Sequence, residues 1–155
     1  MRDIVCTLLC ALGLAGCAST PAPYGNFIGE APAGYDLIVA QDAARQLAAI
    51  YPPAHTRFEL QQATADAFGN RLTASLRARG YAVREAVPSP AAQDGSAGKE
   101  QNPAAAAPAL RLRYVLDRAA DLYRVTLEIG EQSMSRAYLA QNDALRPAGT
   151  WVRKE

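Results

Sequence analysis

Residues 56–87 read TRFELQQATADAFGNRLTASLRARGYAVREAV, and their pattern predicts a strand, a helix and a second strand. Its first part, residues 56–62, places Phe58 and Leu60 on alternate positions, which is the pattern of a half-buried strand. Residues 81–87 alternate in the same way after a helical segment. Two strands joined by one helix through short connections predict a right-handed crossover, with the strands in parallel and the helix packed on their face.

The segment between these strands has the spacing of an amphipathic helix. Thr64 is the predicted N-cap, and Gly80 is predicted to end the helix because glycine readily adopts the C-terminal cap conformation. The apolar side chains of the inner face are four residues apart: Phe68, Leu72 and Leu76. The polar side chains expected to face outward are Asn70, Thr73 and Arg77.

A second helix is predicted upstream, over residues 37–51, with Asp36 as its N-cap and Pro52-Pro53 at its end. Helical spacing predicts the inner face: Leu37, Ala40, Ala44, Leu47, Ala48 and Tyr51. The polar residues expected elsewhere on the helix are Asp42, Arg45 and Gln46. Because the inner face is small, this helix should lie close against a flat surface.

The second half of the chain predicts an antiparallel meander. Residues 110–117 and 123–129 alternate on either side of a turn at Ala119-Ala120-Asp121, which predicts a hairpin. A third strand is predicted over residues 133–140. Helix, strand, helix and strand followed by a meander indicate an α+β fold, with two helices packed on one face of a mixed sheet.

The remaining segments predict connections and an edge. Residues 88–109 consist mainly of Pro, Ala, Gly and Ser, which predicts a flexible loop because so little apolar surface can be buried. Turns are predicted at residues 141–143 and 147–149. Residues 150–153 are either an edge strand or a docked tail, and Trp151 covers the core in both cases.

The N-terminus has the organisation of a secretory signal. Arg2 precedes an apolar run, residues 4–14, which is too short to span a bilayer. The run ends in Leu14-Ala15-Gly16-Cys17, which resembles the lipobox of bacterial lipoproteins. That resemblance implies that Cys17 receives a diacylglycerol, that the residues before it are removed, and that the acyl chains form a stable anchor. The alternative is a buried helix in which Cys17 is a small core residue.

The signal divides the chain into parts: a signal peptide at 1–16, a lipidated tether at 17–35, and a single α+β domain at 36–155 that the loop 88–109 interrupts. Cys6 and Cys10 lie in the signal, so no thiol remains for a disulfide. Ala18, rather than Asp, follows Cys17, which by analogy with other lipoproteins favours the outer membrane. The aromatic residues of the tether either contact a partner or lie in a disordered spacer: Tyr24, Phe27 and Tyr35.

The side chains offer no motif for catalysis or metal binding. The 16 basic and 15 acidic residues are interspersed, so we expect no direct binding of nucleic acid. The one histidine, His55, is expected in an exposed loop, and it alone cannot form a zinc site. The acidic residues expected singly on solvated faces include Glu59, Glu85 and Glu128. Residues 95–99 lack the flanking strand and helix of a phosphate-binding loop. We therefore expect no enzyme, no metal, no cofactor and no small-molecule substrate.

Several motifs together resemble one family: Tyr24-Gly25-Asn26-Phe27, Leu47-Ala48-Ala49-Ile50-Tyr51-Pro52-Pro53-Ala54, Phe68-Gly69, Leu76-Arg77-Ala78-Arg79-Gly80-Tyr81-Ala82-Val83, and Pro147-Ala148-Gly149-Thr150-Trp151-Val152-Arg153-Lys154-Glu155. They are similar to the TrbH-like conjugal transfer lipoproteins. The likeness covers most of the chain after Cys17 except residues 88–109, and its motifs are structural rather than catalytic.

The resemblance implies a non-catalytic part of a type IV secretion apparatus for conjugative DNA transfer. A lipoprotein in such an apparatus is expected at the periplasmic face of the outer membrane, held by its lipid anchor and in contact with other secretion-channel subunits. The alternative is a general envelope assembly lipoprotein that binds lipopolysaccharide or peptidoglycan, which a ligand pocket would distinguish.

Overall fold

The computed structural model describes residues 24–85, 109–141 and 144–155 of the chain. Its strands are β1 Gly25–Asn26, β2 Arg57–Leu60, β3 Ala82–Glu85, β4 Ala109–Ala119, β5 Leu122–Ile129, β6 Gln132–Gln141, β7 Ala144–Pro147 and β8 Val152–Lys154. Its helices are α2 Tyr35–Ile50 and α3 Ala67–Ala78, with the short 3-10 helix η2 at Pro53–His55.

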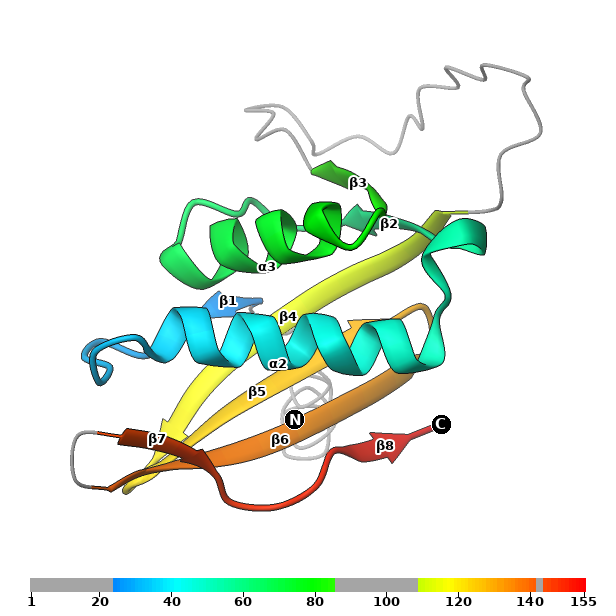
Figure 1. Ribbon diagram of the computed structural model, residues 1–155. Helices are drawn as coiled ribbons and strands as arrows, with labels where there is room; N and C mark the ends of the chain where they lie inside the picture. The colour runs from blue at the N-terminus through cyan, green and yellow to red at the C-terminus, as the bar shows by residue number, and fades with distance from the viewer. Residues whose placement is uncertain (1–23, 86–108, 142–143) are drawn as a thin grey trace, which may run out of the picture.

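The strands form one mixed sheet in the order β3-β2-β4-β5-β6-β7 (Figure 1). β2 pairs in parallel with both β3 and β4, so that Phe58 lies between Val83 and Leu110. β4, β5 and β6 form an antiparallel meander. The predicted α+β fold is confirmed, with β2, α3 and β3 as its strand-helix-strand unit.

Alternation along the long strands sorts their side chains between the two faces of the sheet. On β4, Leu112, Tyr114 and Leu116 are fully buried, whereas the residues between them are partly exposed. β5 likewise buries every second residue from Tyr123 to Ile129. A shift of one residue in strand pairing would move this whole apolar set into solvent, so the sequence pattern specifies the register.

Both helices lie on the same face of the sheet, and the core fills the layer between them and the strands (Figure 1). From α3, the Phe68 ring packs edge-on against Tyr114 of β4, with ring centroids 5.0 Å apart. From α2, Tyr35 packs on Tyr123 of β5 at 5.3 Å. Each helix is therefore fixed to the meander by an aromatic pair in addition to its aliphatic contacts.

The inner face of α3 was predicted correctly, but its cap and one outward residue were not. Phe68, Leu72 and Leu76 are fully buried. Asp66, not Thr64, is the N-cap, and its carboxylate accepts the Gly69 N–H at 2.9 Å. Asn70 and Arg77 face solvent as expected, whereas Thr73 is buried.

The predicted inner face of α2 was correct at Ala40, Ala44, Leu47, Ala48 and Tyr51, which are buried or pack against the core, and wrong at Leu37. The helix begins at Tyr35 after Gly34, whose φ of 76° suits glycine, and Asp36 lies in the first turn rather than at the N-cap. Leu37 is 40% exposed. The fully buried set instead includes Val39 and Ala43, together with the expected Ala40, Ala44 and Leu47. Asp42, which was expected on the polar side, is also buried.

Part of the predicted tether belongs to the folded domain. β1 pairs in parallel with β4, with Gly25 opposite Val115. Tyr35 is only 1% exposed and lies in the protein's own core, so neither alternative given for it, contact with a partner or a disordered spacer, is correct. Phe27 remains 53% exposed.

The C-terminal segment adds two short strands to the free edge of β6. β7 was not predicted as a strand, and it pairs with β6 next to the turn region. β8 pairs with β6 further along the same edge, which selects the edge strand over the docked tail. Trp151, between them, packs against the core as predicted.

Several predictions lie outside the described residues: the signal peptide 1–16, the lipid attachment at Cys17, all of the loop 88–109 except Ala109, and most of the turn 141–143. Ala109 itself is the first residue of β4. Over the described ranges, neither helix is long and apolar enough to cross a membrane.

Candidate functional site

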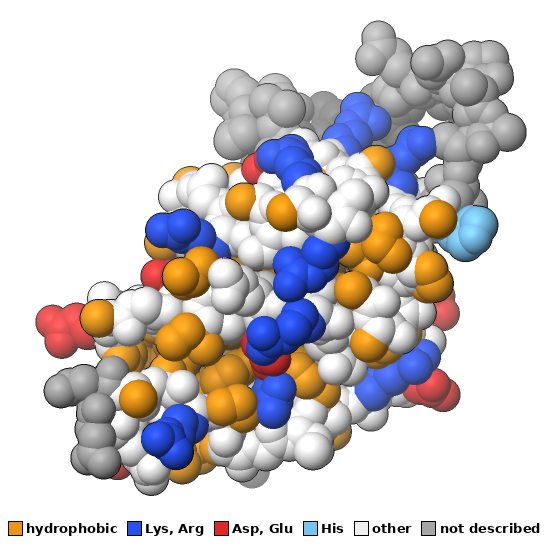
Figure 2. All heavy atoms as spheres, viewed as in Figure 1, with side chains coloured by type: hydrophobic (Ala, Val, Ile, Leu, Met, Phe, Trp, Pro, Cys, Tyr) orange, Lys and Arg blue, Asp and Glu red, His pale blue; other side chains and the backbone are white. Residues whose placement is uncertain are grey.

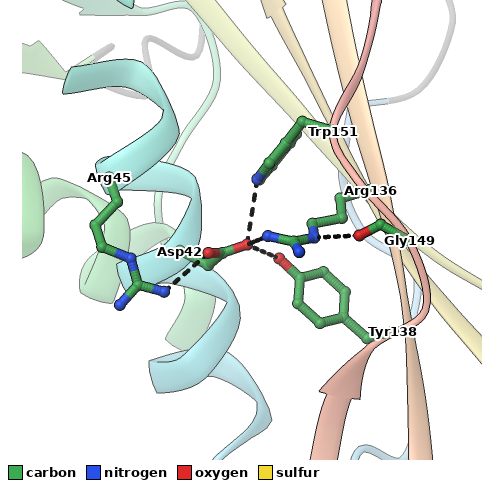
Figure 3. Close-up of polar contacts among 6 residues, drawn as sticks. All are labelled: Asp42, Arg45, Arg136, Tyr138, Gly149 and Trp151. Carbon is green, nitrogen blue, oxygen red and sulfur yellow. Dashed lines mark hydrogen bonds and ion pairs between the residues drawn. The ribbon is translucent and has the colours of Figure 1, made fainter. Parts of the chain in front are cut away.

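The largest polar cluster among the described residues gathers around Asp42 (Figure 3). Asp42 projects from the middle of α2 toward β6, where Arg136 and Tyr138 are two residues apart and therefore point to the same side of the strand. Trp151 reaches the same carboxylate from the segment between β7 and β8. The Asp42 side chain thus joins α2 to β6 and to the C-terminal segment.

The donors to Asp42 occupy both of its oxygens. Oδ2 accepts the Tyr138 hydroxyl at 2.7 Å, Arg136 Nη1 at 2.8 Å and Trp151 Nε1 at 3.2 Å. Oδ1 accepts Arg45 Nη2 at 2.8 Å from one turn further along α2. Arg136 also donates its Nε to the Gly149 carbonyl at 2.9 Å, which ties the C-terminal segment to the cluster (Figure 3).

Burial and hydrogen bonding act in opposite directions on the ionisation of Asp42. Burial raises the pKa of its carboxyl, but hydrogen bonds from Tyr138, Arg45 and Arg136 outweigh burial and hold the pKa below its ordinary value. The pKa of the Tyr138 hydroxyl is raised, first by burial and then by its hydrogen bond to Asp42. Asp42 is therefore ionised and Tyr138 protonated near neutral pH.

This chemistry suits structural attachment. A carboxylate that stays ionised and is saturated with donors is a poor proton donor, and a buried tyrosine with a raised pKa is a poor nucleophile. The cluster joins α2, β6 and the C-terminal segment through charge-assisted hydrogen bonds, which are stronger than neutral ones.

A second polar cluster lies on the open face, which is the side of the sheet opposite α2 and α3 and includes Arg111, Arg113 and Glu128. The Tyr24 hydroxyl donates to Glu128 at 2.9 Å and accepts from Arg113 at 3.1 Å. The Arg113 guanidinium carbon also lies 4.7 Å from the centre of the Tyr24 ring, in cation–π geometry. This cluster fixes the start of β1 across β4 and β5.

An open hollow of about 430 Å³ lies at the turn between β5 and β6. Its lining residues are Tyr51, Leu110, Ile129, Gly130, Glu131, Gln132 and Glu155. The Tyr51 hydroxyl donates to Gln132 across it at 2.9 Å. Its ionisable side chains are Tyr51 and the two carboxylates Glu131 and Glu155.

The match to a known protein family covers this whole arrangement. The family model described as "Conjugal transfer protein TrbH" matches residues 21–155, from the segment before β1 to the end of the chain. The chain belongs to the TrbH family. In comparisons with curated proteins and with solved structures, nothing matches significantly.

The TrbH match confirms the family resemblance seen in the sequence, and the chain is a component of conjugal transfer. Cys17, the one predicted site residue, lies outside the described residues. His55 ends η2 and is exposed. Over the ranges that the structure describes, no three His, Cys, Asp or Glu side chains gather closely enough to hold a metal ion.

The expected solvated carboxylates of this TrbH protein differ from one another. Glu85 accepts from the Thr64 hydroxyl and pairs with Arg77 at 2.8 Å, and these contacts hold its pKa below the ordinary value. Glu128 accepts from Tyr24. The prediction of solitary solvated groups was therefore wrong for both residues.

Sequence reasoning missed Asp42 because its type suggested a solvated position. Its partners on β6 and in the C-terminal segment are between 94 and 109 residues away in the chain. The available signal was the alternation of Arg136 and Tyr138 on a strand, which puts an arginine on the side that buries tyrosine.

Proposed function

We propose that this TrbH family member is a non-catalytic lipoprotein of a conjugative type IV secretion apparatus, attached through Cys17 to the periplasmic face of the outer membrane. The family match over residues 21–155 is the observation that carries the conjugative role. The lipobox-like sequence Leu14-Ala15-Gly16-Cys17 supports the anchor, and Ala18 supports the outer membrane.

The arrangement of polar groups supports a role in attachment. Asp42 is occupied by donors from its own chain. A domain of this kind contributes by binding other secretion-channel subunits and holding them near its anchor. Exposed apolar side chains on the helix-covered side, Leu37 and Ile38, supply surface for such contacts.

The anchor is tested by growing donor cells with labelled palmitate. The wild type should incorporate the label, and Cys17→Ser should not. Cys6→Ser is the matched control, because it makes the same change within the predicted signal and should leave labelling intact. An unlabelled wild type would refute the anchor.

The conjugative role is tested by transfer frequency and by recovery of partners from donor envelopes. Deletion should lower transfer, and wild-type protein should restore it and co-purify with channel subunits. Cys17→Ser should restore transfer poorly. Unchanged transfer after deletion, together with a defect in lipopolysaccharide or peptidoglycan assembly, would favour the general envelope role instead.

A further inference from the structure

The open face of the sheet carries a marked excess of positive charge. Strand register places on this face the basic residues Arg57, Arg84, Arg111, Arg113, Arg124, Arg146 and Lys154. The same registers place there the acidic residues Glu59, Asp117 and Glu128. Seven basic side chains therefore share one surface with three acidic ones.

The rest of the described chain lacks this excess. The described residues contain fourteen Lys and Arg against eleven Asp and Glu. Without the open face, seven basic residues remain against eight acidic ones. On the helix-covered side, Lys and Arg are interspersed with hydrophobic side chains (Figure 2). The net charge of the described residues is therefore close to neutral although the open face of the sheet is basic.

Several open-face arginines are available to an external anion. Arg124 is engaged by Asp117 at 2.7 Å, and Arg113 by Tyr24. In the described part of the chain, no ion pair involves Arg57, Arg84 or Arg111. Guanidinium groups bind phosphate oxygens through two parallel hydrogen bonds, so this set suits a phosphate-bearing surface.

The position of Tyr24 connects this face to the anchor. Tyr24 is held on the open face by Arg113 and Glu128, and Cys17 precedes it by seven residues. Seven residues span at most about 25 Å even when fully extended. The membrane must therefore lie within that distance of the open face if Cys17 carries the lipid.

We propose that the open face rests on the anionic phospholipid surface that holds the lipid anchor, so that the helix-covered side points away from the membrane toward partner proteins. The proposal rests on lipidation of Cys17. Basic side chains are attracted to an anionic bilayer within about a Debye length, roughly 8–10 Å at physiological salt. The connection of at most about 25 Å lets the open face reach that range, and the charge attraction then holds it there.

The test uses purified, lipidated full-length protein in vesicles of phosphatidylethanolamine and phosphatidylglycerol. Once Cys6 and Cys10 are removed with the signal and Cys17 is acylated, no free thiol remains, so one added cysteine can carry a nitroxide label. Ser133→Cys places the label on the open face, and Ala74→Cys places it on the exposed side of α3. Accessibility to a water-soluble relaxation agent is measured at both positions.

The expected result is several-fold lower accessibility at residue 133 than at residue 74. Equal aqueous accessibility on a protein that incorporates palmitate would overturn the orientation and leave the anchor intact. Failure to incorporate palmitate would overturn both. A label at residue 74 that is protected instead would mean that the helix-covered side meets the membrane.

Charge is tested separately with the Ser133→Cys label. Arg84→Gln together with Arg111→Gln should raise accessibility at residue 133 several-fold, as should vesicles of phosphatidylcholine alone. Arg71→Gln together with Arg79→Gln removes the same charge from α3 and its C-cap and should leave accessibility unchanged. If both double variants behaved alike, specific contact between the open face and lipid would be refuted.

Discussion

Asp42 and Glu128 are carboxylates with similar hydrogen-bond partners, and they lie on opposite sides of the sheet. Each accepts a tyrosine hydroxyl, and an arginine stands beside each pair. Asp42 is 7% exposed, whereas Glu128 and Tyr24 are half-buried. Its acceptor oxygens also serve α2, β6 and the C-terminal segment, whereas Glu128 joins only β5 to the start of β1.

The contrast shows that the burial of a polar cluster determines how much the cluster contributes to the free energy of unfolding. Hydrogen bonds to a charged group contribute most where water cannot replace a lost partner. If the Asp42 carboxylate were removed, its donors would be left buried without an acceptor. Near Glu128, water can replace the lost acceptor. The cluster around Asp42 should therefore contribute strongly to the free energy of unfolding. The cluster of Tyr24, Arg113 and Glu128 should mainly fix the position of the chain at β1.

The largest effect is expected for Asp42→Asn. The amide is nearly isosteric but leaves the charge of Arg136, whose side chain is 19% exposed, without its counter-charge. Loss of one partner of a buried ion pair costs about 3–5 kcal/mol, so the free energy of unfolding in urea should fall by about 3 kcal/mol.

Asp121→Asn is the control for this change, because its carboxylate is 89% exposed and lies 3.9 Å from Arg118. Its expected effect is below about 0.5 kcal/mol. Equal losses in the two variants would contradict the contrast between buried and exposed carboxylates.

The next largest effect is expected for Gly69→Ala on the same side of the sheet. An added Cβ would overlap the Tyr114 hydroxyl and lie 3.0 Å from the Thr64 Cβ. Although alanine favours helices, overpacking should dominate and lower the free energy of unfolding by about 1–3 kcal/mol. Gly149→Ala is the control, because its Cβ would meet nothing within 4 Å. A stabilised Gly69→Ala variant would show that Tyr114 and Thr64 can shift to make room for the added methyl group.

We expect a smaller effect of Asp42 on how the free energy of unfolding depends on pH. Its pKa is lower in the folded protein than the ordinary 3.8, so its contribution is complete above that value and is lost as pH falls through the folded pKa. The difference in free energy of unfolding between wild type and Asp42→Asn should therefore shrink below about pH 4. A difference that stays constant from neutral to strongly acidic pH would refute this account.

The smallest effect is expected for Tyr24→Phe on the open face. Loss of the hydroxyl removes its bonds to Glu128 and Arg113 but keeps the ring, so global stability should fall by only about 0.5–1 kcal/mol. Amide exchange at Phe27, whose N–H donates to the Leu116 carbonyl, should nevertheless become faster. Tyr138→Phe should instead destabilise the whole domain. A larger loss in the free energy of unfolding for Tyr24→Phe than for Tyr138→Phe would contradict the contrast between the two clusters.

The parts of the fold that the sequence predicted are those set by local periodicity. Leu112, Tyr114 and Leu116 had to share a face once β4 was recognised, and the hairpin partner β5 followed within a few residues. The additional buried residues of α2, Val39 and Ala43, could not be predicted, because alanines dominate two neighbouring faces and small side chains hardly distinguish them. β7 was missed because its four residues lie between two turn-like segments.

The contacts of the polar clusters could not be predicted, for a different physical reason. Three of the four donors to Asp42 come from β6 and the C-terminal segment, far away in the chain, and the pattern of α2 itself gives no sign of them. Tyr24 was grouped with a tether because its neighbours are Pro, Gly and Ala, yet two strand residues and one hydroxyl attach it to the sheet. Thr73 is 3% exposed although its hydroxyl suggested an outward position, because burial depends on the packing around a residue as well as on its type.

The parallel strands β3 and β4 flank β2, and this arrangement makes one stretch of chain free to change in length. Glu85 pairs with Leu60 and Ala109 with Arg57, so the ends of β3 and β4 that residues 86–108 join lie only about a strand length and two strand spacings apart. Roughly five extended residues could span that gap. Each doubling of a closed loop costs only about 0.6 kcal/mol of entropy, so halving or doubling this connection should leave the domain folded. Evolution can therefore lengthen, shorten or recode it with little thermodynamic consequence for the sheet.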